Sequence, residues 1–161
     1  MWKIEPPLEN RKGTLYIGAV NTIELAEKFG TPLYVTDEGR IRENARRLIK
    51  AFKPHYTNFK LKYAIKANNN LSILRIIRSE GTGADASCAE EIQLAKMAGF
   101  EAHDISYTGN YNSNSELKFA IDSNVIINLD DTAILLKLLK FAVPQIMSFR
   151  INPGVGKGKY S

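Results

Sequence analysis

Cysteine is almost absent from this sequence, and histidine is nearly as rare. The 161 residues include one cysteine, Cys88, and two histidines, His55 and His103. A single cysteine cannot form an internal disulfide or a cysteine-based zinc site. The two histidines lie far apart and have no partners at the spacing of metal ligands. We therefore expect neither a disulfide nor a metal centre.

Long apolar segments are missing as well. No stretch reaches the roughly 18 consecutive apolar residues of a membrane-spanning helix. The opening residues, MWKIEPPLEN, lack the apolar core of a signal peptide. We therefore expect a cytoplasmic protein without a membrane partner. Hydrophobic residues still make up 44% of the chain, which is enough for the packed core of one ordinary domain.

Acidic residues are outnumbered by basic ones, 17 to 22, which gives a modest net charge of +5. The densest basic stretch contains Arg40, Arg42, Arg46, Arg47, Lys50 and Lys53. Apolar residues recur there at helical spacing, so the charges are explained as the solvated face of an amphipathic helix. A phosphate-facing patch is the alternative, but no aromatic interleaving or nucleic-acid motif accompanies the charge. We expect no nucleic-acid partner.

What the sequence does contain is a regular alternation of two kinds of segment. Strand-like runs occupy residues 33–37, 60–68, 83–87, 104–110, 125–130 and 145–152. Helix-like runs occupy residues 22–29, 38–52, 71–80, 88–98, 114–123 and 131–142. Ser113 and Glu116 have the spacing of a capping box, while Gly81 and Gly99 stand where helices should end. The alternation predicts parallel βαβ units in an α/β fold.

Two architectures fit this pattern, an open doubly wound sheet and a (β/α)8 TIM-type barrel. Successive strand residues face opposite sides, and each predicted strand has one apolar side and one that turns small and polar. In the fourth strand, Ile105 and Tyr107 oppose Ser106, Thr108 and Asn110. A doubly wound sheet would bury both sides in apolar contacts, whereas a barrel has a single interior. We therefore favour the barrel, of which this chain would supply about the first six strands.

The run YAIKAN places a lysine in a predicted inner strand. Lys66 ends this strand on the same side as the small residue Ala64, so its amine would point inward at the barrel mouth. Desolvation favours the uncharged form of an amine, which is the form that attacks a carbonyl to make an imine. A lysine held in an internal salt bridge is the alternative explanation.

Five segments, collinear along the chain, resemble the pyridoxal-phosphate-dependent decarboxylases with an alanine-racemase-like barrel. They are ELAEKFGTPLYV (24–35), YAIKANNNLSILRII (63–77), GADASCAEEIQLAKMAGF (83–100), YTGNYNSNSEL (107–117) and FRINPGV (149–155). Within this family they look most similar to the diaminopimelate decarboxylases. The resemblance implies a carboxy-lyase of lysine biosynthesis that converts meso-diaminopimelate to L-lysine. It also implies pyridoxal 5'-phosphate as cofactor and a homodimer with shared active sites.

Five site residues follow from the resemblance. Lys66 would bind pyridoxal phosphate as an imine, and Arg150 matches the arginine beside the cofactor ring. Asp85 and Glu91 match acids near the cofactor lysine, and Asn110 matches the asparagine of the (H/T)GN turn. Three of them also have structural explanations. Asp85 could cap the next helix, Glu91 could be a first-turn acid favoured by the helix dipole, and Asn110 could be a turn former.

The same resemblance indicates an incomplete enzyme. Family members continue well beyond INPGVGKGKYS with the last barrel strands, a glycine-rich phosphate loop, the acid that pairs with the ring nitrogen and a C-terminal β domain. We therefore expect residues 1–30 to be the first helix and the segment that joins the β domain. Residues 31–161 would be a partial, inactive, pyridoxal-phosphate-binding barrel. The GKGKYS tail lacks the spacing of a phosphate loop and is expected to be a surface loop.

Other functions stay open at this point. An ornithine, arginine or carboxynorspermidine decarboxylase would use the same barrel, although YTGNYNSNSEL favours diaminopimelate. A non-catalytic relative that binds pyridoxal phosphate would keep the barrel, but the presence of both Lys66 and Arg150 argues against it. In a purely structural or partner-binding α/β domain, Lys66 would be an inert charge.

Overall fold

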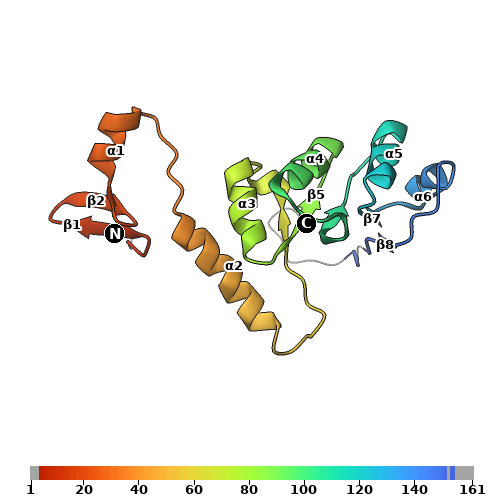
Figure 1. The fold of residues 1–161 in the computed structure, drawn as a ribbon, viewed down its shortest axis with the longest axis horizontal. Helices are drawn as coiled ribbons and strands as arrows, with labels where there is room; N and C mark the ends of the chain where they lie inside the picture. Colours follow the sequence, from red (N-terminus) through yellow and green to blue (C-terminus); the bar gives the residue numbers. More distant parts are fainter. Residues whose placement is uncertain (1–3, 152, 155–161) are drawn as a thin grey trace.

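The chain folds around two sheets that α2 (Glu38–Phe52) connects (Figure 1). The structure is a computed structural model, and it describes residues 4–151 together with 153 and 154. Within that part of the chain no helix is long and apolar enough to cross a membrane. Asn152 and the predicted GKGKYS loop lie outside the described residues.

The first sheet is a small antiparallel one at the N-terminal side of α2. Its strands are β1 (Leu8–Arg11), β2 (Thr14–Ile17) and β3 (Val20–Asn21), in that order. The two-residue turn between β1 and β2 has positive φ at both Lys12 and Gly13, as a tight hairpin turn requires. The expected helix follows directly as α1 (Thr22–Phe29), with the Asn21 side chain capping its start and Gly30 ending it.

The second sheet is parallel, and its strand order is the order of the sequence. It comprises β4 (Lys62–Ala64), β5 (Gly83–Ala86), β6 (Ile105–Tyr107), β7 (Ile126–Leu129) and β8 (Met147–Phe149). Because each strand pairs with the next one along the chain, every crossover advances in the same direction. A doubly wound sheet would instead reverse its strand order at a switch point.

The helices between these strands consequently lie on one face of the sheet (Figure 1). They are α3 (Leu71–Ser79), α4 (Ala89–Ala98), α5 (Asn114–Asp122) and α6 (Thr132–Leu138). An outer layer of helices around a parallel sheet that advances in one direction is the wall of a barrel. The prediction of a partial α/β barrel is confirmed, as are the capping box at Ser113 and Glu116 and the left-handed helix end at Gly99.

Side chains on the two faces of the parallel sheet differ as the alternation predicted. The face toward the helices is apolar, and Ala84, Ile105 and Ile127 on it are almost completely buried. The opposite face carries polar residues, such as Asp85 and Ser106, which are paired across β5 and β6. The hydrophobic core thus lies between the sheet and the helices, and the opposite, polar face can carry functional side chains.

The predicted strands are all shorter in the structure or, in one case, absent. Residues 33–37 form no strand, so the parallel sheet has five strands rather than six. A short extended segment gains strand hydrogen bonds only beside a neighbour, and residues 33–37 run separately toward the N-cap of α2, with Tyr34 fully exposed. The predicted strand 60–68 is also shorter. It becomes β4, which stops at Ala64, and a 3-10 turn, η1 (Ile65–Ala67).

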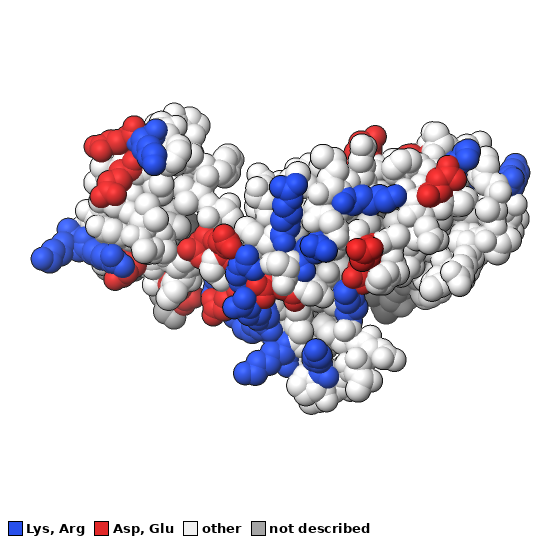
Figure 2. Space-filling model, in the orientation of Figure 1, with Lys and Arg blue, Asp and Glu red and all other residues white. Residues whose placement is uncertain are grey.

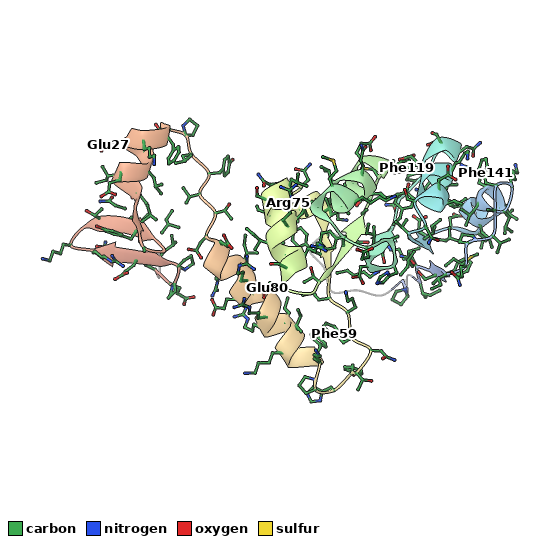
Figure 3. All side chains as sticks on the ribbon, in the orientation of Figure 1. Glu27, Phe59, Arg75, Glu80, Phe119 and Phe141 are labelled. Carbon is green, nitrogen blue, oxygen red and sulfur yellow. The ribbon has the colours of Figure 1, made fainter. Side chains whose placement is uncertain are left out.

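The basic face of α2 is more than a solvated surface. Figure 2 shows lysine and arginine side chains gathered around this helix with acidic ones among them. Arg42 Nη1 and Arg46 Nε donate to the carboxylate of Glu80 at 2.6 and 2.5 Å. Glu80 directly follows α3 as its C-cap residue and lies beside α2 (Figure 3), and its side chain is only 7% exposed. These contacts join two helices and show that two of the predicted solvated charges have a structural role.

We expect the change Glu80→Gln to lower the midpoint of thermal unfolding by a few degrees at neutral pH. Hydrogen bonds from Arg46 and Arg42 hold the pKa of Glu80 below its ordinary value of 4.5. A group with a depressed folded-state pKa stabilises the fold above its unfolded pKa, and this contribution is lost as the pH falls through the folded pKa. The difference from wild type should therefore narrow below about pH 4.5.

Thermal unfolding followed from neutral to acidic pH measures this difference. The matched control is Glu43→Gln, which removes an exposed carboxylate whose one ion-pair partner among the described residues is Arg40 in its own helix. A Glu80→Gln difference that stays constant over the whole pH range would show that the ion pairs do not stabilise the fold.

Candidate active site

A polar cavity of about 590 Å³ opens at the carboxyl ends of the parallel strands. It is lined by Lys66, Asp85, Ser87, Thr108, Asn110, Asn128 and Arg150. Every strand of the sheet contributes to this lining, either from its last residues or from the loop that follows it. In barrels of parallel strands this is the end where catalytic groups collect. A second, mostly apolar cavity of about 510 Å³ between α2, β4 and α3 includes none of the five predicted site residues.

Lys66 reaches the cavity from η1, directly after β4. The neighbouring Ile65 is fully buried and anchors this turn in the core. Lys66 itself is exposed and lies in η1 after β4 ends, so it is not the last residue of the strand as the alternation predicted. Its place in a turn accounts for the difference, because the alternation of faces ends with the strand. The described residues give Lys66 no ion pair, which removes the support for an internal salt bridge.

Asp85 lies on the polar face of β5, and its carboxylate is partly buried. Its Oδ1 accepts a hydrogen bond from Thr108 Oγ1 at 3.1 Å. The simpler explanation for this residue was a helix cap, but the N-cap position of α4 is Cys88, with no capping side chain. Asp85 is therefore a cavity residue held by the next strand.

Glu91 is the one predicted site residue outside the cavity lining. It lies in the first turn of α4, where its Oε2 accepts a hydrogen bond from the backbone N–H of Ser87 at 2.6 Å. Ser87 lines the cavity. Glu91 thus fixes the loop between β5 and α4. It acts on the cavity indirectly, through its hydrogen bond to Ser87.

Asn110 reaches the cavity from the loop after β6. The preceding Gly109 is buried against a hydrogen-bonded pair in which Asn112 Nδ2 donates to the hydroxyl oxygen of Tyr107 at 2.5 Å. Burial raises the pKa of Tyr107 to about 12, so this hydroxyl stays protonated at physiological pH. A β-carbon at position 109 would collide with the Asn112 amide and lie 2.7 Å from the Tyr107 oxygen. The glycine is therefore what allows the loop to rest on this pair.

Arg150 follows β8, and its backbone N–H donates to the Leu129 carbonyl at 2.6 Å. Its side chain is exposed and lines the cavity. Because β4 and β8 are the outer strands of the sheet, Lys66 and Arg150 come from its two ends. Two cations with the Asp85 carboxylate between their strands suit a small ligand that carries negative charge and a carbonyl group.

Three cavity residues were not nominated from the sequence, namely Ser87, Thr108 and Asn128. The alternation could have found the last two, because both fall on the polar side of their strands at the carboxyl end. Lys62, which is on the same face of β4 as Ala64, lines the apolar cavity and not this one. Its Nζ donates to Ser106 Oγ at 2.5 Å, and burial lowers the pKa of its amine.

Comparison with known proteins places this cavity in a family context. Residues 38–161 match a family model described as the pyridoxal binding domain of pyridoxal-dependent decarboxylases. A diaminopimelate decarboxylase of Methanothermobacter thermautotrophicus is 50% identical over 157 residues, which cover 96% of this chain and 37% of that protein. This chain therefore spans little more than a third of the length of that relative.

Solved structures agree on the fold. The crystal structure of diaminopimelate decarboxylase from Methanocaldococcus jannaschii in complex with L-lysine has a TM-score of 0.85 at 33% identity, covering 94% of this chain and 37% of that one. A lysine/ornithine decarboxylase of Vibrio vulnificus complexed with putrescine has a TM-score of 0.70 at 24% identity, covering 81% of this chain and 35% of its own. The second likeness concerns the fold alone.

Proposed function

The chain belongs to the pyridoxal-dependent decarboxylases, and on this premise we propose that the natural gene product converts meso-diaminopimelate to L-lysine and carbon dioxide. The observation that carries the proposal is the cavity that collects Lys66, Asp85, Asn110 and Arg150 from separate strands. Two similarities support the choice of substrate. A diaminopimelate decarboxylase is 50% identical to the chain, and a solved relative of the same name holds L-lysine.

The residues present fit pyridoxal 5'-phosphate. Lys66 supplies an accessible primary amine for a covalent bond to the cofactor carbonyl. Arg150 supplies a positive charge for an anionic cofactor or substrate, and Asn110 supplies an exposed amide. When bound, pyridoxal phosphate takes up the electron pair that remains after carbon dioxide leaves. Asp85 lines the same cavity as Lys66 and is the carboxylate that we assign to the cofactor site, while Glu91 fixes the adjoining loop.

The larger organisation is proposed on the same basis. Residues 1–30 would form one unit with the antiparallel sheet and α1, and residues 31–161 the partial barrel that binds the cofactor. We also propose that the enzyme acts as a homodimer with shared active sites, in the cytoplasm. The family premise supports these proposals.

A decarboxylase of ornithine or arginine is the second candidate, because such an enzyme shares the fold. These two relatives are 24% and 21% identical to the chain, whereas the diaminopimelate decarboxylases reach 50%. A purely structural domain would not require the lysine and the arginine to line one cavity. We therefore favour the diaminopimelate substrate.

The test is to purify the natural gene product, add pyridoxal phosphate and offer each substrate separately. We expect carbon dioxide release and L-lysine formation from meso-diaminopimelate, and at least about 100-fold lower kcat/KM with ornithine or arginine. Comparable turnover of ornithine would move the function to the second candidate. Absence of carbon dioxide release from any of the three, with the cofactor bound, would favour the non-catalytic relative.

A further inference from the structure

A row of hydrogen bonds crosses the polar face of the sheet and ends at Asp85. Ser148 Oγ donates to Asn128 Oδ1 at 2.8 Å, and Asn128 Nδ2 donates to Thr108 Oγ1 at 3.4 Å. Thr108 Oγ1 in turn donates to Asp85 Oδ1 at 3.1 Å. Asp85, Asn128 and Ser148 belong to β5, β7 and β8, and Thr108 directly follows β6, so four neighbouring strands of the five take part and β4 does not.

The direction of this row is fixed by chemistry. An ionised carboxylate only accepts hydrogen bonds, so the single proton of the Thr108 hydroxyl must be donated to Asp85. The oxygen of Thr108 then has lone pairs for the Asn128 amide N–H, and the amide carbonyl accepts from Ser148. Each group thus presents its positive end toward Asp85, and such aligned hydrogen bonds polarise one another.

The register of the sheet maintains the row. Asn128 is paired directly with Ser148, and Tyr107 is paired with Ile127, which places the next residues, Thr108 and Asn128, side by side. Because register is set by the backbone ladder, the polar side chains meet without relying on mobile loops.

We propose that Thr108, Asn128 and Ser148 are positioning residues that orient the Asp85 carboxylate at the wall of the cavity. Holding Oδ1 with Thr108 leaves the second carboxylate oxygen available to the lining shared with Lys66. The cofactor role of this cavity rests on the proposed function, but the orientation of Asp85 does not. The three residues act through Asp85, and none of them is itself a catalytic group.

The first test measures the dissociation constant of pyridoxal phosphate for variants of the natural gene product by equilibrium dialysis. Thr108→Val keeps the shape and removes the donor to a charged group, so we expect binding to weaken by about tenfold. Asn128→Leu and Ser148→Ala remove more distant members and should weaken binding by about threefold and twofold. Thr108→Ser keeps the hydroxyl and should restore binding to near the wild-type value.

Two controls separate orientation from general damage. Ser106→Ala removes an inward hydroxyl on β6 that bonds Lys62 and lies outside the row, so it should leave binding unchanged. In an Asp85→Ala background, Thr108→Val should cause no further loss, because its acceptor is already gone. Additive losses, or a loss with Ser106→Ala as large as that with Thr108→Val, would overturn the proposal.

Crystal structures of the wild-type gene product and the Thr108→Val variant supply a readout that does not depend on the cofactor. We expect the bond from Thr108 to Asp85 in the wild type and a rotated or disordered Asp85 side chain in the variant. An Asp85 side chain with an unchanged orientation in the variant would overturn the proposal that the hydrogen-bonded row orients it. If the wild type fails to bind pyridoxal phosphate, the proposed function is wrong. The comparison of the two crystal structures still shows whether Thr108 orients Asp85.

Discussion

Replacing Lys66 with alanine is expected to abolish both decarboxylation and the visible absorbance of the bound cofactor. Lys66 is the accessible amine of the cavity, and no other lysine lines it within the described residues. On the proposed function Lys66 binds pyridoxal phosphate covalently, so without this amine kcat should fall by about a thousandfold or more. Absorbance after dialysis and release of carbon dioxide from meso-diaminopimelate measure the two effects.

The matched control is Lys96→Ala, which removes an exposed lysine from the last turn of α4 and should leave both measurements unchanged. Visible absorbance of the cofactor imine that survives dialysis in Lys66→Ala would show that another amine binds the cofactor. Full activity in this variant would show that the assignment of Lys66 as the cofactor lysine is wrong.

The change Gly109→Ala is expected to lower the free energy of unfolding by about 2–4 kcal/mol and to reduce decarboxylation strongly. The added methyl group would meet the Asn112 amide and the Tyr107 hydroxyl, both of which are buried and bonded to each other. The loop must therefore lift, which moves Asn110 away from the cavity. Denaturation in urea measures the first effect, and kcat/KM measures the second.

A second substitution shows whether steric conflict is the cause. Adding Asn112→Ala removes the amide that the new methyl group meets first, so the pair of changes should recover part of the stability lost in Gly109→Ala. If Gly109→Ala is as stable as wild type, the loop does not rest on the Tyr107–Asn112 pair. No recovery in the double variant would place the strain elsewhere.

Much of the barrel wall could be predicted because its residues repeat a simple pattern. The alternation of Ile105 and Tyr107 with Ser106 and Thr108 indicated one packed face and one open face, and the structure has both. The cavity at the strand ends follows from that pattern and from the parallel topology. The family resemblance added the identity of particular residues, which the pattern alone could not supply.

The failures of prediction have local causes. Residues 33–37 have strand-like composition, but a strand also needs a neighbour, and composition does not show which edge is available. Lys66 was placed inside a strand because the alternation continues through it. The run Asn68, Asn69 and Asn70 indicates that the strand ends early, because asparagine side chains compete for backbone hydrogen bonds. Asn68 accepts a hydrogen bond from the backbone N–H of Asn70, and Asn70 caps α3.

The pairing of α2 with α3 could not be predicted either. Glu80 and the arginines Arg42 and Arg46 are distant in sequence, and charge spacing within one helix says nothing of a partner on another. The hydrogen-bonded row that ends at Asp85 could not be predicted from the sequence, because hydrogen bonds between side chains on different strands depend on the strand register. Both features depend on how segments distant in the sequence pack together, and the sequence alone does not show this packing.

The most direct test of the proposed role of Lys66 is to trap the cofactor on the protein and locate it. The natural gene product would be incubated with pyridoxal phosphate, reduced with borohydride, digested and mapped by mass spectrometry. We expect to find the reduced pyridoxyl group on Lys66. Modification of Lys62, which lies on the preceding strand, or the absence of any specific modified lysine, would contradict it.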